Sequence, residues 1–400
     1  MEQKKLWAER GQNVLMNTYK RGEKVLVEGQ GCYVTDVDGN RFLDFVSGIA
    51  VNALGHSNAA LVDALTHQGQ SLIHTSNLFW NQPSIEAAEQ LVRLSGLGKV
   101  FFANSGAEAN ESAIKLARKW GKETKRQEDA VEIISLTQSF HGRTMATLSA
   151  TGQPVMHQDF SPTLPGFRYV PLNDSDALYK AVSPQTCAIM IEVIQGEGGI
   201  HLISSEFVET LKQLQKNQKI LLIIDEIQTG IGRTGTLFAY QQFDLMPDMI
   251  TLAKGLGGGF PIGALVTSDK VASHFGPGDH GTTFGGNPLA GACAKAVLAT
   301  IERDKLLDNV IERSEQLVNG LKQLQAEFPS IQEVKGLGLL IGVQFDKKVD
   351  DLIDTCYEKR LLVTTAKGNV IRFMPPLNVT ASEIDEALAI FNQVLQEDIS

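Results

Sequence analysis

The chain has 400 residues, of which 43% are hydrophobic and 20% charged, and it carries a formal net charge of −10 at pH 7. A chain of this length and composition is globular and can bury a large core, so one large and one smaller domain are expected. The acidic balance argues against nucleic acid and anionic membrane surfaces as partners.

The first residues contain no apolar signal segment, and no stretch approaches the length needed to span a membrane. The four cysteines, Cys32, Cys187, Cys293 and Cys356, are scattered without the spacing of metal ligands. They indicate ordinary thiols of a reducing compartment. We therefore expect a cytoplasmic protein.

The chain begins with a segment, residues 1–60, that predicts an irregular arm followed by a β-hairpin. The two hairpin strands, near residues 31–37 and 41–45, flank Asp38-Gly39. An Asp-Gly pair between two strands is a strong turn signal.

The next notable segment is a strand near residues 100–103 that runs directly into Ser105, Gly106 and Ala107. A helical apolar pattern follows, and Ser105 and Glu108 have the spacing of a capping box. Free N–H groups and the dipole at a helix N-terminus favour an anion. This turn is therefore a candidate phosphate site, although a capped helix that binds nothing is the commoner outcome for such a motif alone.

A strand at residues 132–136 ends shortly before Phe140 and Arg143. An aromatic side chain just past a strand end either fills the core or covers a planar ring, and Phe140 alone favours the core. An arginine next to a glycine is suited to clamping a carboxylate. A surface arginine is the alternative for Arg143.

The centre of the chain contains two short apolar runs, residues 220–224 and 249–252, which end at Asp225 and just before Lys254. Such runs predict parallel strands buried on both faces, and ligands of such sheets bind at the carboxyl ends of the strands. The glycine after Lys254 leaves room for a bulky group. A pyridoxal phosphate site needs this pair, because lysine forms a Schiff base and aspartate keeps the pyridinium nitrogen protonated. A structural salt bridge is the alternative.

Two other motifs are weaker. Residues 230–235 fit the G-x-G-x-x-G pattern of dinucleotide-binding folds. That fingerprint opens a helix directly after a strand, whereas five residues intervene here and no clear helical stripe follows. His56, His141 and His280 are well separated and lack carboxylates at metal-site spacing, which disfavours a metal site.

The predicted fold class is α/β, with a large domain whose mostly parallel central sheet is flanked by helices. We expect three parts: an arm and hairpin (1–60) that pack with the small domain, a large cofactor-binding domain (61–290) and a small C-terminal α+β domain (291–400). Further helices are predicted near residues 61–70, 84–94, 205–215 and 381–395, and further strands near 188–193, 262–267, 338–345, 361–364 and 370–373.

Together these pieces resemble the class III, fold type I pyridoxal phosphate aminotransferases over nearly the whole chain. The resemblance rests on motifs at residues 104–110, 140–143, 195–199, 225–230, 253–254 and 281–288. Segments 48–56, 336–342 and 368–373 look like the branch that acts on acetylornithine.

The resemblance implies pyridoxal 5′-phosphate as cofactor and assigns roles around it. Lys254 would attach the cofactor covalently and then move the proton as general base and acid, Asp225 would pair with the pyridinium nitrogen, and Gln228 would contact the ring hydroxyl. Phe140 would stack on the ring. The phosphate would be held by Ser105, Gly106 and Ala107 together with Thr283 of the partner subunit, which implies a homodimer.

The resemblance also implies the substrates. Arg143 would hold the carboxylate of acetylornithine, and Arg372 the α-carboxylate of glutamate or 2-oxoglutarate, with Glu197 as its switchable partner. Tyr19 and Thr282 would line the pocket. The implied ping-pong reaction moves the δ-amino group of N2-acetyl-L-ornithine to 2-oxoglutarate, giving N-acetyl-L-glutamate 5-semialdehyde and L-glutamate, a step of arginine biosynthesis.

Two departures and two alternatives accompany this interpretation. Val193 stands where many relatives have proline, and Ile49 stands where ornithine aminotransferases have tyrosine, which argues against free ornithine. Ornithine, 4-aminobutyrate, succinylornithine and succinyl-diaminopimelate remain alternative donors. Another pyridoxal phosphate enzyme of this fold, such as a mutase, would keep Lys254 and Asp225 without needing Arg143, Arg372 and Glu197 together. A non-catalytic binding protein would not need the lysine.

Overall fold

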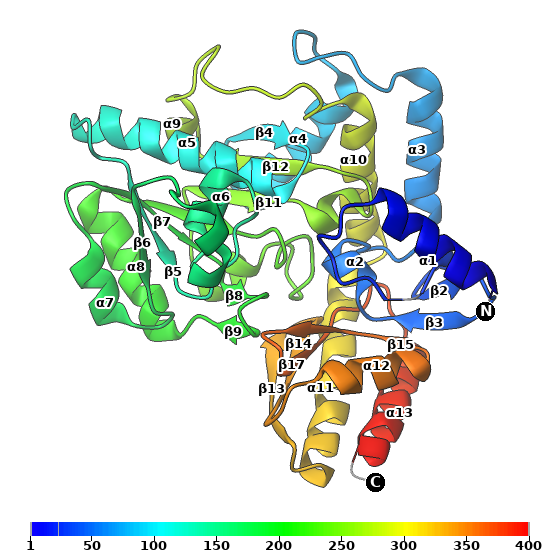
Figure 1. Ribbon diagram of the computed structural model, residues 1–400. Coiled ribbons are helices and arrows are strands. Elements are labelled where there is room, and N and C mark those ends of the chain that lie inside the picture. The colour runs from blue at the N-terminus through cyan, green and yellow to red at the C-terminus, as the bar shows by residue number, and fades with distance from the viewer. Residues whose placement is uncertain (1, 23, 399–400) are drawn as a thin grey trace.

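The computed structural model describes residues 2–22 and 24–398, and its largest element is a seven-stranded sheet (Figure 1). β12 runs antiparallel to both of its neighbours and the other pairs are parallel. The predicted α/β fold with a mostly parallel sheet is therefore confirmed. The strands in spatial order are β4 (Lys99–Ala103), β12 (Gly263–Thr267), β11 (Met249–Leu252), β10 (Leu221–Asp225), β7 (Thr186–Ile191), β5 (Glu132–Leu136) and β6 (Phe167–Val170).

This sheet is buried on both faces, as its continuous apolar runs predict. Ile223 lies in a buried cluster with side chains of α5 (Gly106–Lys125), and the next residue, Ile224, lies in a second cluster with side chains of α8 (Ser205–Gln218). Successive side chains of a strand point to opposite faces, so the two helices cover opposite faces of the sheet. Function is therefore expected at the strand ends rather than on a face.

The C-terminal part of the chain forms a smaller antiparallel sheet, drawn in yellow to red in Figure 1. β13 was not predicted, because this edge strand is largely polar and has no apolar run. α10 (Pro288–Arg303) packs against α3, α4 and α11 and crosses the boundary predicted near residue 290, so the division into domains stays a prediction. The elements of this part are α11 (Leu306–Glu327), β13 (Ile331–Leu337), β14 (Leu340–Phe345), α12 (Asp350–Glu358), β16 (Thr364–Ala366), β17 (Val370–Phe373) and α13 (Ala381–Asp398).

The N-terminal hairpin, β2 (Tyr33–Asp36) and β3 (Arg41–Asp44), is confirmed. β15 (Leu361–Leu362) pairs with β3 and joins this hairpin to the C-terminal part. The predicted irregular arm was wrong in part, because it contains helix α1 (Glu2–Val14). Most residues of α1 are good helix formers, but no apolar stripe marks the helix.

The remaining elements connect these parts. Within the described part of the chain, no helix is both long and apolar enough to cross a membrane. The elements that connect the parts are β1 (Leu26–Gln30), α2 (Ser47–Ala50), α3 (Ala59–Ser71), α4 (Gln82–Ser95), α6 (Met145–Ala150), α7 (Ser175–Ala181), β8 (Ile194–Gln195), β9 (His201–Leu202), α9 (Asp269–Ala272) and short 3-10 turns at Pro154–Met156, Gln158–Phe160, Ala239–Phe243 and Lys254–Gly257.

Candidate active site

The candidate site lies where the central strands end. β10 and β11 are parallel neighbours, and Asp225 at the end of β10 is in register with Thr251, three residues before Lys254. The carboxylate and the lysine therefore share one edge of the sheet, as their sequence positions predict. Both line a cavity of about 490 Å³, which is large enough for a small-molecule cofactor.

Most of the site residues predicted from the sequence meet in this cavity. Arg372 lies behind Glu197, while Tyr19, Thr282 and Thr283 are not part of the cavity wall within this chain. The predicted residues that line the cavity are Ser105, Gly106, Ala107, Phe140, Arg143, Glu197, Asp225, Gln228 and Lys254.

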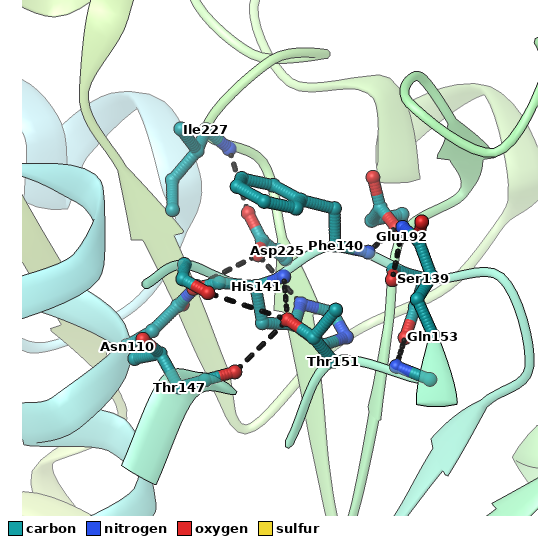
Figure 2. Close-up of polar contacts among 12 residues, drawn as sticks. Asn110, Ser139, Phe140, His141, Thr147, Thr151, Gln153, Glu192, Asp225 and Ile227 are labelled. Carbon is teal, nitrogen blue, oxygen red and sulfur yellow. Dashed lines mark hydrogen bonds and ion pairs between the residues drawn. The ribbon is translucent and has the colours of Figure 1, made fainter. Parts of the chain in front are cut away.

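Asp225 is held rigidly by three donors (Figure 2). Its Oδ2 accepts hydrogen bonds from Nδ1 of His141 and Nδ2 of Asn110, each at 2.8 Å, and its Oδ1 accepts one from the backbone N–H of Ile227 at 3.1 Å. Because a carboxylate only accepts, Nδ1 of His141 carries a proton. Burial acts to lower the pKa of His141, but its hydrogen bond to Asp225 and the negative charges of Asp225 and Glu192 together outweigh burial and raise the pKa.

His141 and Asn110 lie within the motifs at residues 140–143 and 104–110, but the sequence assigned neither of them a role. The backbone carbonyl of His141 also accepts from Nδ2 of Asn110 at 2.7 Å, so the two residues support each other as well as Asp225. The position of His141 directly after Phe140, past a strand end, was the available signal. For Asn110 the signal was its place in the motif at residues 104–110, one helical turn after Gly106.

Lys254 has the electrostatic properties of a nucleophile. Burial lowers its pKa to about 8, with Glu197 opposing the shift and Arg372 adding to it. Its side chain makes no hydrogen bond or ion pair with any residue that the structure describes. A substantial fraction of this amine is therefore neutral at mildly alkaline pH and free to react with a carbonyl group.

An ion pair between the buried Arg372 and the partly exposed Glu197 lies beside the lysine. Nη1 of Arg372 lies 2.6 Å from Oε1 of Glu197 and also donates to the carbonyl of Gly196 at 3.3 Å. Gln228 donates from Nε2 to the same oxygen of Glu197 at 3.3 Å. Burial acts to raise the pKa of Glu197, but the charge and hydrogen bond of Arg372, together with Lys254 and Gln228, outweigh burial and lower the pKa.

Glu192 was absent from the predicted site, although it lines the cavity. Its Oε2 accepts the backbone N–H of Phe140 at 3.0 Å (Figure 2). Burial raises its pKa to about 7, and the charge of Asp225 acts in the same direction. Its place directly after β7 corresponds to that of Asp225 at the end of β10, and this was the signal to use.

The N-terminus of α5 forms another wall of the cavity. Ser105 caps the helix, since its Oγ accepts the N–H of Glu108 at 3.2 Å. The N–H groups of Gly106 and Ala107 have no partner within the helix, because they belong to its first turn. This twenty-residue helix therefore presents free donors and the positive end of its dipole to the cavity.

The four predicted residues outside the cavity wall occupy different surroundings. Arg372 is described above, and the hydroxyl of Thr282 accepts from Nδ2 of Asn104 at 3.1 Å. Thr283 is exposed. Tyr19 is 70% exposed and lies beneath the guanidinium of Arg21. The site roles predicted for these threonines and for Tyr19 stay predictions.

The donor set fits pyridoxal 5′-phosphate. A helix N-terminus suits its phosphate, a fixed carboxylate suits its ring nitrogen, the ring of Phe140 suits its aromatic face and the unpaired amine of Lys254 suits its aldehyde. Across residues 2–22 and 24–398 no group of three or more histidine, cysteine or acidic side chains could hold a metal ion.

Comparison with known proteins gives a consistent result. Residues 17–395 match the family described as aminotransferase class-III. The acetylornithine aminotransferase of Caldanaerobacter subterraneus is 51% identical, over 96% of this chain and 97% of that protein. Two solved structures are similar: the ornithine aminotransferase of Toxoplasma gondii (TM-score 0.96, 32% identity, 99% and 96% of the two chains) and the N-acetylornithine aminotransferase of Stenotrophomonas maltophilia (TM-score 0.84, 39% identity, 95% and 98%).

Proposed function

The chain belongs to the class-III aminotransferases, which depend on pyridoxal phosphate, and we propose that it transfers the δ-amino group of N2-acetyl-L-ornithine to 2-oxoglutarate. The products are N-acetyl-L-glutamate 5-semialdehyde and L-glutamate. The observation that carries this proposal is the ion pair of the buried Arg372 with the partly exposed Glu197 beside Lys254, because one site must accept two different kinds of substrate.

The chemistry at the reacting carbon is divided between the cofactor and two side chains. When bound, pyridoxal phosphate supplies an electron sink for the bond that breaks at the amine-bearing carbon. Asp225, fixed by His141 and Asn110, would hold the proton on the ring nitrogen. Lys254 would bind the cofactor and, once displaced by substrate, carry the proton between the two reacting carbons.

The arginines would distinguish the two half-reactions. In the first, Arg143 at the cavity wall binds the α-carboxylate of acetylornithine, while Glu197 keeps Arg372 neutralised. In the second, the α-carboxylate of 2-oxoglutarate replaces Glu197 as the partner of Arg372. Glu197 and the α-carboxylate of 2-oxoglutarate compete for the guanidinium of Arg372. This buried group is therefore paired in both half-reactions.

We further propose that the active form is a homodimer in which Thr283 of the partner subunit completes the phosphate site. Thr283 is exposed, and the adjacent Phe284 is 59% exposed. Leu78, Phe79 and Trp80 are also strongly exposed, and clustered apolar residues at a surface favour an interface.

Free ornithine is the second candidate donor, favoured by the TM-score of 0.96 to the ornithine aminotransferase of Toxoplasma gondii. The test is a comparison of kcat/KM for acetylornithine, ornithine, 4-aminobutyrate, succinylornithine and succinyl-diaminopimelate with 2-oxoglutarate as acceptor. The proposal predicts the largest value for acetylornithine. A larger value for any other amine would assign the enzyme to that donor.

A further inference from the structure

The glycine-rich segment at residues 230–235 has no role in the proposed chemistry, yet it contains a deeply buried cation. Arg233 is 2% exposed, and burial lowers its pKa to about 10. It forms no ion pair with any residue in the part of the chain that the structure describes. A buried guanidinium without a counterion disfavours folding, so its retention calls for a reason.

The guanidinium of Arg233 serves backbone carbonyls of the smaller sheet. Its Nη1 donates to the carbonyl of Leu339 at 3.0 Å and to that of Pro375 at 2.5 Å. The backbone carbonyl of Arg233 in turn accepts the N–H of Leu339 at 2.9 Å. Pro375 is followed by Pro376, and both prolines have a carbonyl group but no backbone N–H. The hydrogen-bond donor for the carbonyl of Pro375 therefore comes from another segment.

The glycines make this contact possible. Gly232 and Gly235 have φ values of +88° and +96°, which allow the loop to turn towards the smaller sheet. Gly338, at φ +56°, approaches the loop so closely that a Cβ there would lie 2.5 Å from backbone atoms of Thr234. The glycines of this motif thus serve the close approach of two backbone segments. They give it the spacing of a dinucleotide fingerprint without its function.

This junction lies between two parts of the active site. On one side, the loop follows Asp225 and Gln228 at the end of β10. On the other, Leu339 precedes β14 and Pro375 follows β17, two paired strands in which Arg372 faces Gly342 (Figure 1). Arg233 therefore holds the ends of both strands at the position from which Arg372 reaches Glu197.

From this geometry we propose that Arg233 is a positioning residue that sets where Arg372 lies relative to Glu197, and thereby determines affinity for the dicarboxylate substrates, 2-oxoglutarate and glutamate. The proposal rests on the proposed function in one respect, the binding of these substrates by Arg372. It assigns Arg233 no contact with substrate. Acetylornithine, which would be held by Arg143, should be affected little.

The test compares both half-reactions in Arg233→Met, with Arg233→Lys used where the methionine variant does not fold. The expected result is a rise in KM for 2-oxoglutarate and glutamate of at least about tenfold, the size expected when a charged hydrogen-bonding group is misplaced. KM for acetylornithine and the dissociation constant of the cofactor should change by no more than about twofold, within the spread of unrelated sites.

Two further variants separate positioning from general destabilisation. Tyr240→Phe removes a buried hydrogen bond from the Tyr240 hydroxyl to the carbonyl of Ser95, away from Arg372, and should leave the 2-oxoglutarate KM unchanged. In an Arg372→Lys background, loss of Arg233 should add little to the KM, because the group that it positions has already been altered.

The proposal is overturned if KM for both substrate types rises equally, if neither changes, or if the effects of Arg233 and Arg372 are additive. Failure of the proposed donor is a separate result. In that case wild-type protein does not react with acetylornithine, while its reaction with glutamate still tests Arg233.

Discussion

Replacing Lys254 by methionine should abolish transamination and at the same time stabilise the cofactor-free protein. The pKa of this lysine falls from its ordinary 10.5 to about 8 because its ammonium group is buried. That shift corresponds to about 3 kcal/mol of lost stability at neutral pH. Methionine has similar length and no charge, so the variant should regain much of this free energy.

The sign of the pH dependence follows from proton binding. Between pH 8 and pH 10.5 the unfolded lysine keeps its proton while the folded lysine releases it, so wild-type stability rises with pH across this window. The advantage of the variant should therefore be complete below pH 8 and fade above it. Loss of the attraction between Lys254 and Glu197 will offset part of the gain.

The assay is urea unfolding of both cofactor-free proteins at several pH values, with equal m-values as the condition for comparison. The expected difference at pH 7 is between about 1 and 3 kcal/mol in favour of the variant. A variant that is less stable than wild type at pH 7, or a difference that does not shrink with rising pH, would refute the reasoning.

Three other predictions follow from the same site. The folded state holds the proton of the Glu192 carboxyl group more tightly than the unfolded state, so wild type should lose stability as pH rises from 4.5 to about 7. Glu192→Gln should remove this loss, which urea unfolding across that pH range measures. Asp225→Asn should lower the pKa of His141, visible in an NMR titration of cofactor-free protein, and reduce kcat by at least about a hundredfold. The rate at which cofactor-free protein binds pyridoxal phosphate covalently should increase with pH with a midpoint near 8, as stopped-flow absorbance would show. A flat profile, an unmoved histidine or an unchanged stability slope would contradict the respective prediction.

The sheet could be predicted well because its strands are defined by local patterns. The strand at residues 132–136 and the strand at 249–252 coincide with β5 and β11, since short segments that are mainly apolar and lie between turns have one stable location in a buried sheet. Helix α1 and edge strand β13 could not be found in this way. α1 is largely exposed and β13 is only partly buried, so their positions depend on helix propensity or on pairing rather than on an apolar pattern.

The site residues, too, divide into those that local sequence patterns predict and those that they do not. Asp225 and Lys254 could be found because strand ends mark them, and neighbouring strands bring them to one edge. Asn110 lies 115 residues from Asp225 in the sequence, and no local pattern announces their hydrogen bond. Arg233 was likewise concealed, since its role depends on carbonyls more than 100 residues away in the chain.

The most direct test of the central claim is a half-reaction recorded by absorbance. Purified protein carrying pyridoxal phosphate would be mixed with acetylornithine alone, and 2-oxoglutarate added afterwards. We predict rapid loss of the absorbance of the Lys254-bound cofactor, followed by its full return, with no cycle in Lys254→Met. Persistence of the original spectrum with acetylornithine, or a cycle that survives loss of Lys254, would contradict the account.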